Sequence, residues 1–119
     1  MGLRCFLLAK LHNATITEAN VNYRGSIAIC PELLRASGIR VNEQVDVYNT
    51  TNGNRLTTYV IEGKKGQVCL NGAAALKGAV GDKIIIAAYT WLSPQEMENH
   101  RATVVIVGEG NTVEEVLKK

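Results

Sequence analysis

Apolar residues alternate with polar ones along most of the chain, in short segments separated by glycine, asparagine and proline. A period of two is typical of strands with one buried face. We therefore expect strands at 3–11, 26–30, 44–49, 55–62, 67–70, 83–91 and 103–107. Residues 14–18 either continue the first strand or pair with it. The run Ile84–Ile86 indicates that the strand 83–91 is buried on both faces.

Three short helical segments interrupt the strands. Residues 31–38 begin with Pro31, which suits a first helical turn, and end with Gly38, which suits a left-handed stop. Residues 73–76 predict one turn of helix. Residues 94–99 follow Ser93, and Glu96 completes a capping box.

Two loop segments carry further expectations. Asn52-Gly53 is a strong hairpin signal and predicts a type I′ turn. The polar end, residues 108–119, is expected to fray or to form a terminal turn.

The predicted elements fit a single β-barrel domain over residues 1–119. Short strands with brief helical turns imply a closed or nearly closed barrel of mainly β class. The strands 3–11 and 83–91 are long for so small a barrel. One use of the excess length is packing between subunits.

Composition and charge exclude several classes of function. The net charge is only +2 and the basic residues are scattered, so we expect no nucleic-acid partner. The apolar run 3–9 is far shorter than the ~20 residues that span a bilayer, and no cleavage site follows it. We therefore expect a cytoplasmic protein with no membrane partner.

The cysteines do not indicate a metal site or a disulfide framework. Cys5, Cys30 and Cys69 are odd in number and widely spaced, no C-x-x-C occurs, and only two histidines are present. We interpret all three as reduced thiols buried in strands.

The dipeptide Gly25-Ser26 carries the most specific candidate chemistry. No Walker loop, H-E-x-x-H or G-x-S-x-G motif is present. A serine hydroxyl can attack the carbonyl of the preceding residue and convert the amide into an ester. β-Elimination then frees the upstream carboxylate and leaves dehydroalanine, which hydrolyses to a pyruvoyl group. Glycine tolerates the backbone strain that this reaction needs.

Four blocks of sequence set this dipeptide in a wider pattern. They are K-L-H at 10–12, Y-R-G-S-I-A-I at 23–29, N-G-N-R-L-T-T-Y at 52–59 and N-G-A-A-A at 71–75. In this order, and with G-D at 81–82, they resemble the aspartate 1-decarboxylase family. The resemblance extends over about residues 7–107.

The resemblance implies a fold, a reaction and an assembly. The fold would be a double-psi β-barrel of six or seven strands with short helices, assembled as a homotetramer with active sites between subunits. The proenzyme, or zymogen, would cleave itself at Gly25-Ser26 into residues 1–25 and residues 26–119, with or without a maturation factor. The pyruvoyl group made from Ser26 would form a Schiff base with L-aspartate. This lyase would release CO2 and β-alanine for pantothenate and coenzyme A biosynthesis, without a metal or pyridoxal phosphate.

The resemblance also implies roles for particular residues. Lys10 and Arg55 would bind the two substrate carboxylates. Tyr59 would reprotonate the carbanion, and Thr58 would stabilise the oxyanion during cleavage.

Further site residues follow from the same resemblance. Asn71, Gly72, Ala73 and Ala74 would form a small-residue wall that binds substrate, and His12 and Tyr23 would line the site. Two positions depart from the family pattern: Arg24 and Cys30 stand where acidic residues are common. Arg24 flanks the scissile bond and can alter the cleavage rate, whereas Cys30 is expected to lie away from it.

Other readings of the sequence stay open. The chain can be a non-catalytic β-barrel binding module or an inactive paralogue that never cleaves. It can also be a serine hydrolase that uses Ser26, with His12 and an aspartate as partners.

Overall fold

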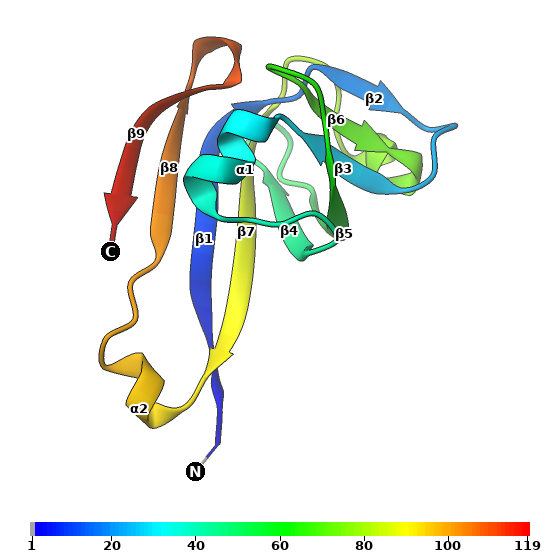
Figure 1. Cartoon of the computed structure of the whole chain (residues 1–119). Coiled ribbons are helices and arrows are strands. Elements are labelled where there is room, and N and C mark those ends of the chain that lie inside the picture. The colour runs from blue at the N-terminus through cyan, green and yellow to red at the C-terminus, as the bar shows by residue number, and fades with distance from the viewer. Residues whose placement is uncertain (1) are drawn as a thin grey trace.

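The computed structural model describes residues 2–119, and Figure 1 shows a mainly β chain with a few short helices. The strands are β1 (Arg4–Thr15), β2 (Glu18–Asn20), β3 (Ser26–Ile29), β4 (Gln44–Asn49), β5 (Arg55–Glu62), β6 (Val68–Asn71), β7 (Lys83–Leu92), β8 (Thr103–Gly108) and β9 (Thr112–Lys118). They form one nine-stranded sheet in the order β2-β6-β3-β5-β4-β7-β1-β8-β9. The predicted mainly β class is confirmed, and the architecture is consistent with a double-psi β-barrel.

The helices are short and their ends follow the sequence signals. Helix α1 (Pro31–Ser37) stops at Gly38, whose φ is 78° and whose N–H donates to the Leu34 carbonyl. Helix α2 (Pro94–Met97) has the predicted capping box between Ser93 and Glu96. The 3-10 helices are η1 (Gly72–Lys77) and η2 (Glu109–Asn111). No helix in residues 2–119 is long and apolar enough to cross a membrane.

Strand pairing is mixed, which the alternation pattern alone does not predict. β1 pairs antiparallel with β7 and parallel with β8. β3 lies between β5, to which it is parallel, and β6, to which it is antiparallel. Ser26, the first residue of β3, therefore begins a strand that has a neighbouring strand on each side, β5 and β6.

The core lies along one face of the strands and under α1. Its fully buried aliphatic side chains include Leu11, Ile16, Ile27, Ile29, Leu33, Leu70, Ile84 and Ile86. Ala9 and Leu11 of β1 point into this core, whereas Lys10 and His12 lie on its less buried face. The alternation along β1 therefore places core residues on one face and candidate site residues on the other.

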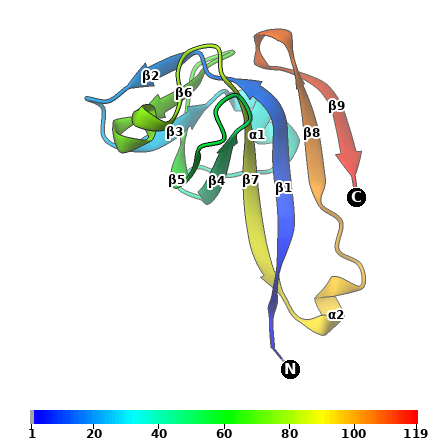
Figure 2. The same cartoon turned by 180° about the vertical axis from the view of Figure 1, so that it is seen from behind.

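The long antiparallel pair of β1 and β7 extends past the body of the molecule, with α2 at its far end, in both Figures 1 and 2. In β7, Ile84 and the residues from Ile86 to Ala88 are buried and Ile85 is half-buried, but Tyr89 and Trp91 are exposed. The prediction that β7 is buried on both faces is wrong for this second half. The isoleucine run that suggested it ends before the strand leaves the barrel.

Several local predictions need correction. The sheet has nine strands, more than the six or seven expected, because β2 and β9 are additional. The polar end of the chain does not fray: β9 pairs antiparallel with β8 from Thr103↔Lys118 to Gly108↔Thr112. Edge strands tolerate polar residues on both faces, so alternation gave no signal there.

The turn type and two cysteines also differ from expectation. Only Gly53 of the Asn52-Gly53 pair has a positive φ, so the β4–β5 hairpin is not closed by a type I′ turn. Its loop is wider, with Asn49 N–H donating to the Asn54 carbonyl. Cys69 is a buried thiol in a strand as expected, Cys30 is buried but lies at the N-cap of α1 just after β3, and Cys5 is exposed.

Candidate active site

Ser26 is almost fully enclosed at the start of β3. Its exposed fraction is 1%, and its partner across the antiparallel pair with β6 is Asn71. Asn71 Nδ2 donates a hydrogen bond to Ser26 Oγ at 3.3 Å. Asn71 Oδ1 in turn accepts from the Cys69 thiol at 3.2 Å. The hydroxyl of Ser26 is therefore the end of a hydrogen-bonded line that begins at Cys69 and passes through Asn71, both in β6.

A pocket of about 220 Å³ opens beside this serine. Five predicted site residues line it together: Gly25, Ser26, Thr58, Ala73 and Ala74. Leu56, Thr57 and Lys77 complete its wall. The methyl side chains contributed by η1 leave room next to the Gly25-Ser26 peptide, which suits the close approach of a small substrate.

Gly72 lies directly against the backbone before Ser26. Its φ is 60°, and a Cβ there would stand 2.7 Å from both Cα and N of Gly25 and 3.0 Å from the Tyr23 carbonyl oxygen. Only glycine fits this position without moving the chain. Gly25 itself has open space where a Cβ would be.

Three other predicted site residues, Lys10, Arg55 and Tyr59, do not line the Ser26 pocket. Arg55 and Tyr59 share the outward face of β5, while Thr58 points to the opposite face. Lys10 is in register with Ala87, Ala87 with Asp46, and Asp46 with Thr57. Three strand spacings, about 14 Å, thus separate the backbones of Lys10 and β5. One chain does not bring Lys10 to the Ser26 pocket.

Arg55 belongs to a polar cluster on that outward face. Its guanidinium lies 4.6 Å from the centre of the Tyr48 ring. The Tyr48 hydroxyl contacts the Tyr89 hydroxyl at 2.8 Å and donates to Asp46 at 3.3 Å. Burial, followed by the Tyr89 hydrogen bond, raises the pKa of Tyr48 well above its usual value. Tyr48 therefore stays a neutral donor and a firm platform for Arg55.

His12 and Tyr23 occupy different surroundings. The Nδ1 atom of His12 is buried and has no hydrogen-bond partner within residues 2–119. Tyr23 is 54% exposed and lines a second pocket of about 360 Å³, which Cys69 and Asn71 also line. Asn71 thus lines this second pocket and also donates its hydrogen bond to Ser26, which lines the first.

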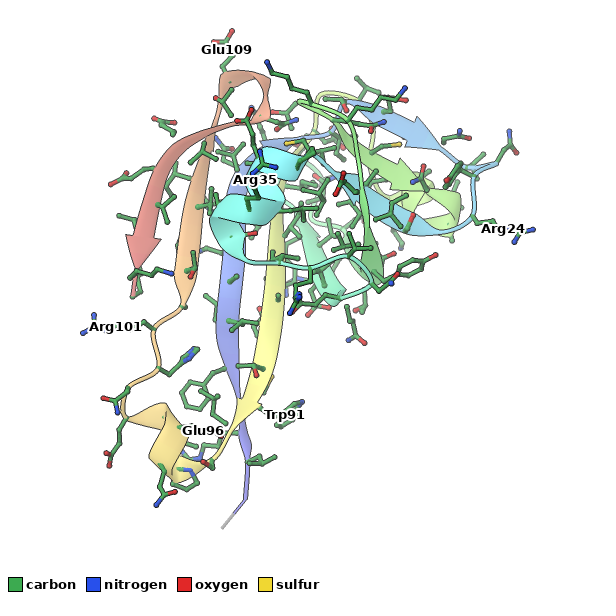
Figure 3. All side chains as sticks on the ribbon, viewed as in Figure 1. Arg24, Arg35, Trp91, Glu96, Arg101 and Glu109 are labelled. Atoms are coloured by element: carbon green, nitrogen blue, oxygen red, sulfur yellow. The ribbon has the colours of Figure 1, made fainter. Side chains whose placement is uncertain are left out.

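The two departures from the family pattern lie on opposite sides of Ser26. Arg24 is exposed and points away from the molecule at the tip of the β2–β3 connection (Figure 3). Cys30 is buried at the start of α1, where its thiol donates to the Asn111 carbonyl at 3.7 Å. The expectation that Cys30 lies away from the scissile bond is confirmed.

Sequence reasoning missed three residues of this region. Lys77 lines the Ser26 pocket, Cys69 donates a hydrogen bond to Asn71, and the Tyr48 ring lies under the Arg55 guanidinium. None belongs to a chemical motif: Lys77 ends η1, Cys69 precedes Asn71 by two positions on β6, and only Tyr48 is brought beside its partner by the sheet register, Tyr48↔Arg55. Within residues 2–119, no cluster of three or more His, Cys, Asp or Glu side chains has the arrangement of a metal site.

A serine buried beside a pocket of small residues in a mixed sheet defines a small β-barrel protein with a candidate active site. Comparison with known families is specific: the family described as aspartate decarboxylase matches residues 2–114. The chain belongs to the aspartate decarboxylase family. It is accordingly an enzyme of the carboxy-lyase class.

Individual relatives agree over nearly the whole length. An aspartate 1-decarboxylase of Bdellovibrio bacteriovorus is 52% identical over 113 residues, which cover 95% of this chain and 91% of the relative. One of Sulfurimonas denitrificans is 48% identical over 94% of each chain. One of Caldicellulosiruptor bescii is 53% identical over 90% of this chain and 85% of its own.

Proposed function

We propose that the chain decarboxylates L-aspartate to β-alanine and CO2, a step that supplies pantothenate and coenzyme A biosynthesis in the cytoplasm. Family membership supports the reaction. The observation that carries the proposal is the burial of Ser26 Oγ beside Gly25 at a pocket of small residues. The chain would be made as a proenzyme that cleaves itself there.

Cleavage uses only atoms of the chain and one water. Ser26 Oγ attacks the Gly25 carbonyl carbon, the C–N bond breaks, and an ester joins the two residues. Loss of the Ser26 α-proton then breaks the Cβ–Oγ bond and leaves a Gly25 carboxylate and dehydroalanine. Water hydrolyses the dehydroalanine to a pyruvoyl group and ammonia. The products are residues 1–25 and residues 26–119.

The residues around Ser26 fit this chemistry. Asn71 Nδ2 donates to Ser26 Oγ, and Thr58 lines the same pocket as Gly25, which supports its role as the donor to an oxyanion on the Gly25 carbonyl. Once formed, the pyruvoyl group supplies an electrophilic carbonyl that accepts the electrons released when CO2 departs. The proposal involves no metal and no pyridoxal phosphate.

We assign substrate binding and proton return to Arg55, Lys10 and Tyr59. Arg55 presents a planar fork that suits a carboxylate, Lys10 supplies a second cation, and Tyr59, which is 43% exposed, returns the proton. Because none of these side chains lines the Ser26 pocket of its own chain, and Lys10 is the farthest of them along the sheet, we propose that a neighbouring subunit supplies part of the set. Active sites between subunits of a homotetramer meet this need, and the protruding β1–β7 strand pair offers surface for such packing.

The wall of the site completes the substrate-binding proposal. Ala73, Ala74 and the neighbouring Gly72 and Asn71 limit the size of the ligand that can reach residue 26. His12 and Tyr23 would line the assembled site.

The mass spectrum of the denatured protein tests the proposal directly. We expect two fragments, the first ending at Gly25 and the second beginning with a carbonyl-blocked residue 26. Ser26→Ala should remain one chain and have no decarboxylase activity. A single full-length mass that persists after prolonged warm incubation, with and without a cell extract that could supply a maturation factor, would contradict it.

The alternative functions predict different outcomes. A non-catalytic binding module or inactive paralogue would stay intact, and family membership does not favour it. A serine hydrolase needs a base at Ser26, but the hydrogen-bond partner of Ser26 Oγ is the amide of Asn71, which is not a base. Such a hydrolase would stay intact and react with a serine-directed phosphonate.

A further inference from the structure

Cys69, Asn71 and Ser26 form a buried hydrogen-bonded line across two strands. The Cys69 thiol donates to Asn71 Oδ1 at 3.2 Å, and Asn71 Nδ2 donates to Ser26 Oγ at 3.3 Å. Cys69 and Asn71 are each 4% exposed, and both belong to β6 beside β3. The proposed self-cleavage gives Cys69 no role.

The thiol influences which end of the Asn71 amide faces the serine. An asparagine side chain has a donor end and an acceptor end, and a half-turn exchanges them. A protonated thiol can donate to an amide oxygen, whereas its sulfur is a weak acceptor for an N–H group, so Cys69 favours the orientation with the oxygen end toward itself and the NH2 end toward Ser26. Among residues 2–119, the thiol has one other hydrogen-bond acceptor, the Leu70 carbonyl, at a longer 3.8 Å. Burial, together with the charge of Glu18, raises the pKa of Cys69, so the group keeps its proton at neutral pH.

The orientation of this amide matters for the attack on Gly25. As Ser26 Oγ loses its proton it gains negative charge, which an N–H donor stabilises and a carbonyl oxygen repels. A flipped Asn71 would present Oδ1 to the serine, accept its O–H hydrogen bond and oppose deprotonation. An amide free to occupy both orientations would spend part of its time in the unproductive one.

We propose that Cys69 is a positioning residue for self-cleavage, whose thiol holds the Asn71 amide with its N–H end toward Ser26 Oγ. This inference rests on the proposed function, because it concerns the rate at which residues 1–25 and 26–119 separate. It assigns Cys69 no contact with substrate and no redox role.

Three single variants test the proposal against loss of packing. Cys69→Ala removes the donor, and Cys69→Ser keeps an O–H donor at the same place. Cys30→Ala is the matched control: Cys30 is also a buried cysteine, 1% exposed, whose thiol donates to a backbone carbonyl, that of Asn111, away from Ser26. Full-length chains made in a purified cell-free system would be incubated with and without cell extract, and intact chain would be followed by mass spectrometry.

We expect Cys69→Ala to cleave about five- to tenfold more slowly than the parent, the effect of one lost buried hydrogen bond. Cys69→Ser should recover most of the rate, and Cys30→Ala should match the parent. In an Asn71→Ala background, Cys69→Ala should have no further effect, because the amide that it orients is gone. If Cys69→Ala folds poorly by circular dichroism, Cys69→Val provides a donor-free side chain that fills the space.

The other outcomes overturn the proposal in distinguishable ways. Equal rates for parent and donor-free chains would exclude a positioning role for Cys69 while leaving the proposed function intact. Equal slowing by Cys69→Ala and Cys30→Ala, or by Cys69→Ala and Cys69→Ser, would show that packing alone is responsible. A parent chain that never cleaves under either condition would overturn both this inference and the proposed function.

Discussion

Gly72 and Gly25 touch backbone to backbone, although 46 positions separate them in the chain. A Cβ on Gly72 would stand 2.7 Å from Cα and N of Gly25. No side-chain rotation relieves such an overlap, because both contacted atoms belong to the main chain. Gly72, the first residue of η1, therefore packs directly against the backbone that precedes Ser26.

We predict that Gly72→Ala impairs cleavage more than it impairs folding. The added methyl must push Gly25 away, which moves the carbonyl that Ser26 attacks, and we expect cleavage to slow by at least about tenfold. The left-handed φ adds a destabilisation of roughly 1–3 kcal/mol. Mass spectrometry of the fresh chain and thermal unfolding measure the two effects separately.

Gly81→Ala is the control for that backbone strain. Gly81 has a φ of 94°, and a Cβ there would meet nothing within 4 Å. We expect a loss of stability without slower cleavage. If Gly81→Ala slows cleavage as much as Gly72→Ala, general destabilisation and not contact with Gly25 explains the effect.

Local signals in the sequence predicted the elements well where one residue type decides the conformation. Gly38 ends α1 and Ser93 with Glu96 caps α2, because these are short-range hydrogen-bond effects. The Asn52-Gly53 loop shows where such local signals fail to predict the conformation. Asn49 Oδ1 accepts from the N–H groups of Thr51 and Asn52, so a side chain outside the dipeptide shapes a wider turn.

Which strands lie beside each other could not be read from alternation. The parallel pair Ile27↔Val60 joins two segments whose patterns are equally compatible with other partners. The resemblance of the four sequence blocks supplied Gly25, Ser26, Thr58, Ala73 and Ala74, which the fold collects around one pocket. Cys69 was missed because its contact with Asn71 depends on burial within β6 and not on any motif.

Arg55→Ala should separate substrate binding from cleavage. Arg55 lies on the outward face of β5, stacked on Tyr48, whereas Thr58 lines the Ser26 pocket. We expect cleavage at the parental rate and a loss of about 10- to 100-fold in kcat/KM for aspartate, as for one charged hydrogen-bond partner. Arg55→Lys should recover only part of this loss because it lacks the bidentate fork.

Steady-state decarboxylation of fully cleaved protein provides the measurement for Arg55. Arg101→Ala removes the same charge from an exposed position (Figure 3) and should leave kcat/KM unchanged. Unimpaired turnover in Arg55→Ala would refute its role as a carboxylate ligand.

Asp82 should make stability depend on acid pH. Its carboxylate accepts from Asn49 Nδ2 and from the Ala79 N–H, each at 2.9 Å, and these bonds hold the pKa of Asp82 below its usual value of 3.8. The contribution to stability is therefore complete above the unfolded pKa and is lost as the pH falls through the lower folded pKa. We expect Asp82→Ala to unfold more easily than the parent at pH 7.

The difference between Asp82→Ala and the parent should shrink as the pH falls below about 4. Urea unfolding between pH 3 and pH 7 measures it, with Glu109→Gln at an exposed turn as the control (Figure 3). A difference that stays constant over this range would show that the Asp82 charge is not responsible.

Co-expression of two inactive chains should test whether the active site is shared between subunits. Lys10→Ala subunits keep Ser26 and can form the pyruvoyl group, whereas Ser26→Ala subunits keep Lys10. If Lys10 acts on the Ser26 pocket of a neighbouring chain, mixed assemblies contain some complete sites and recover part of the parental activity. Each variant expressed alone is the control and should show little activity. If Lys10 acts within its own chain, no mixture can combine it with Ser26, and the mixed assemblies should be no more active than the separate variants.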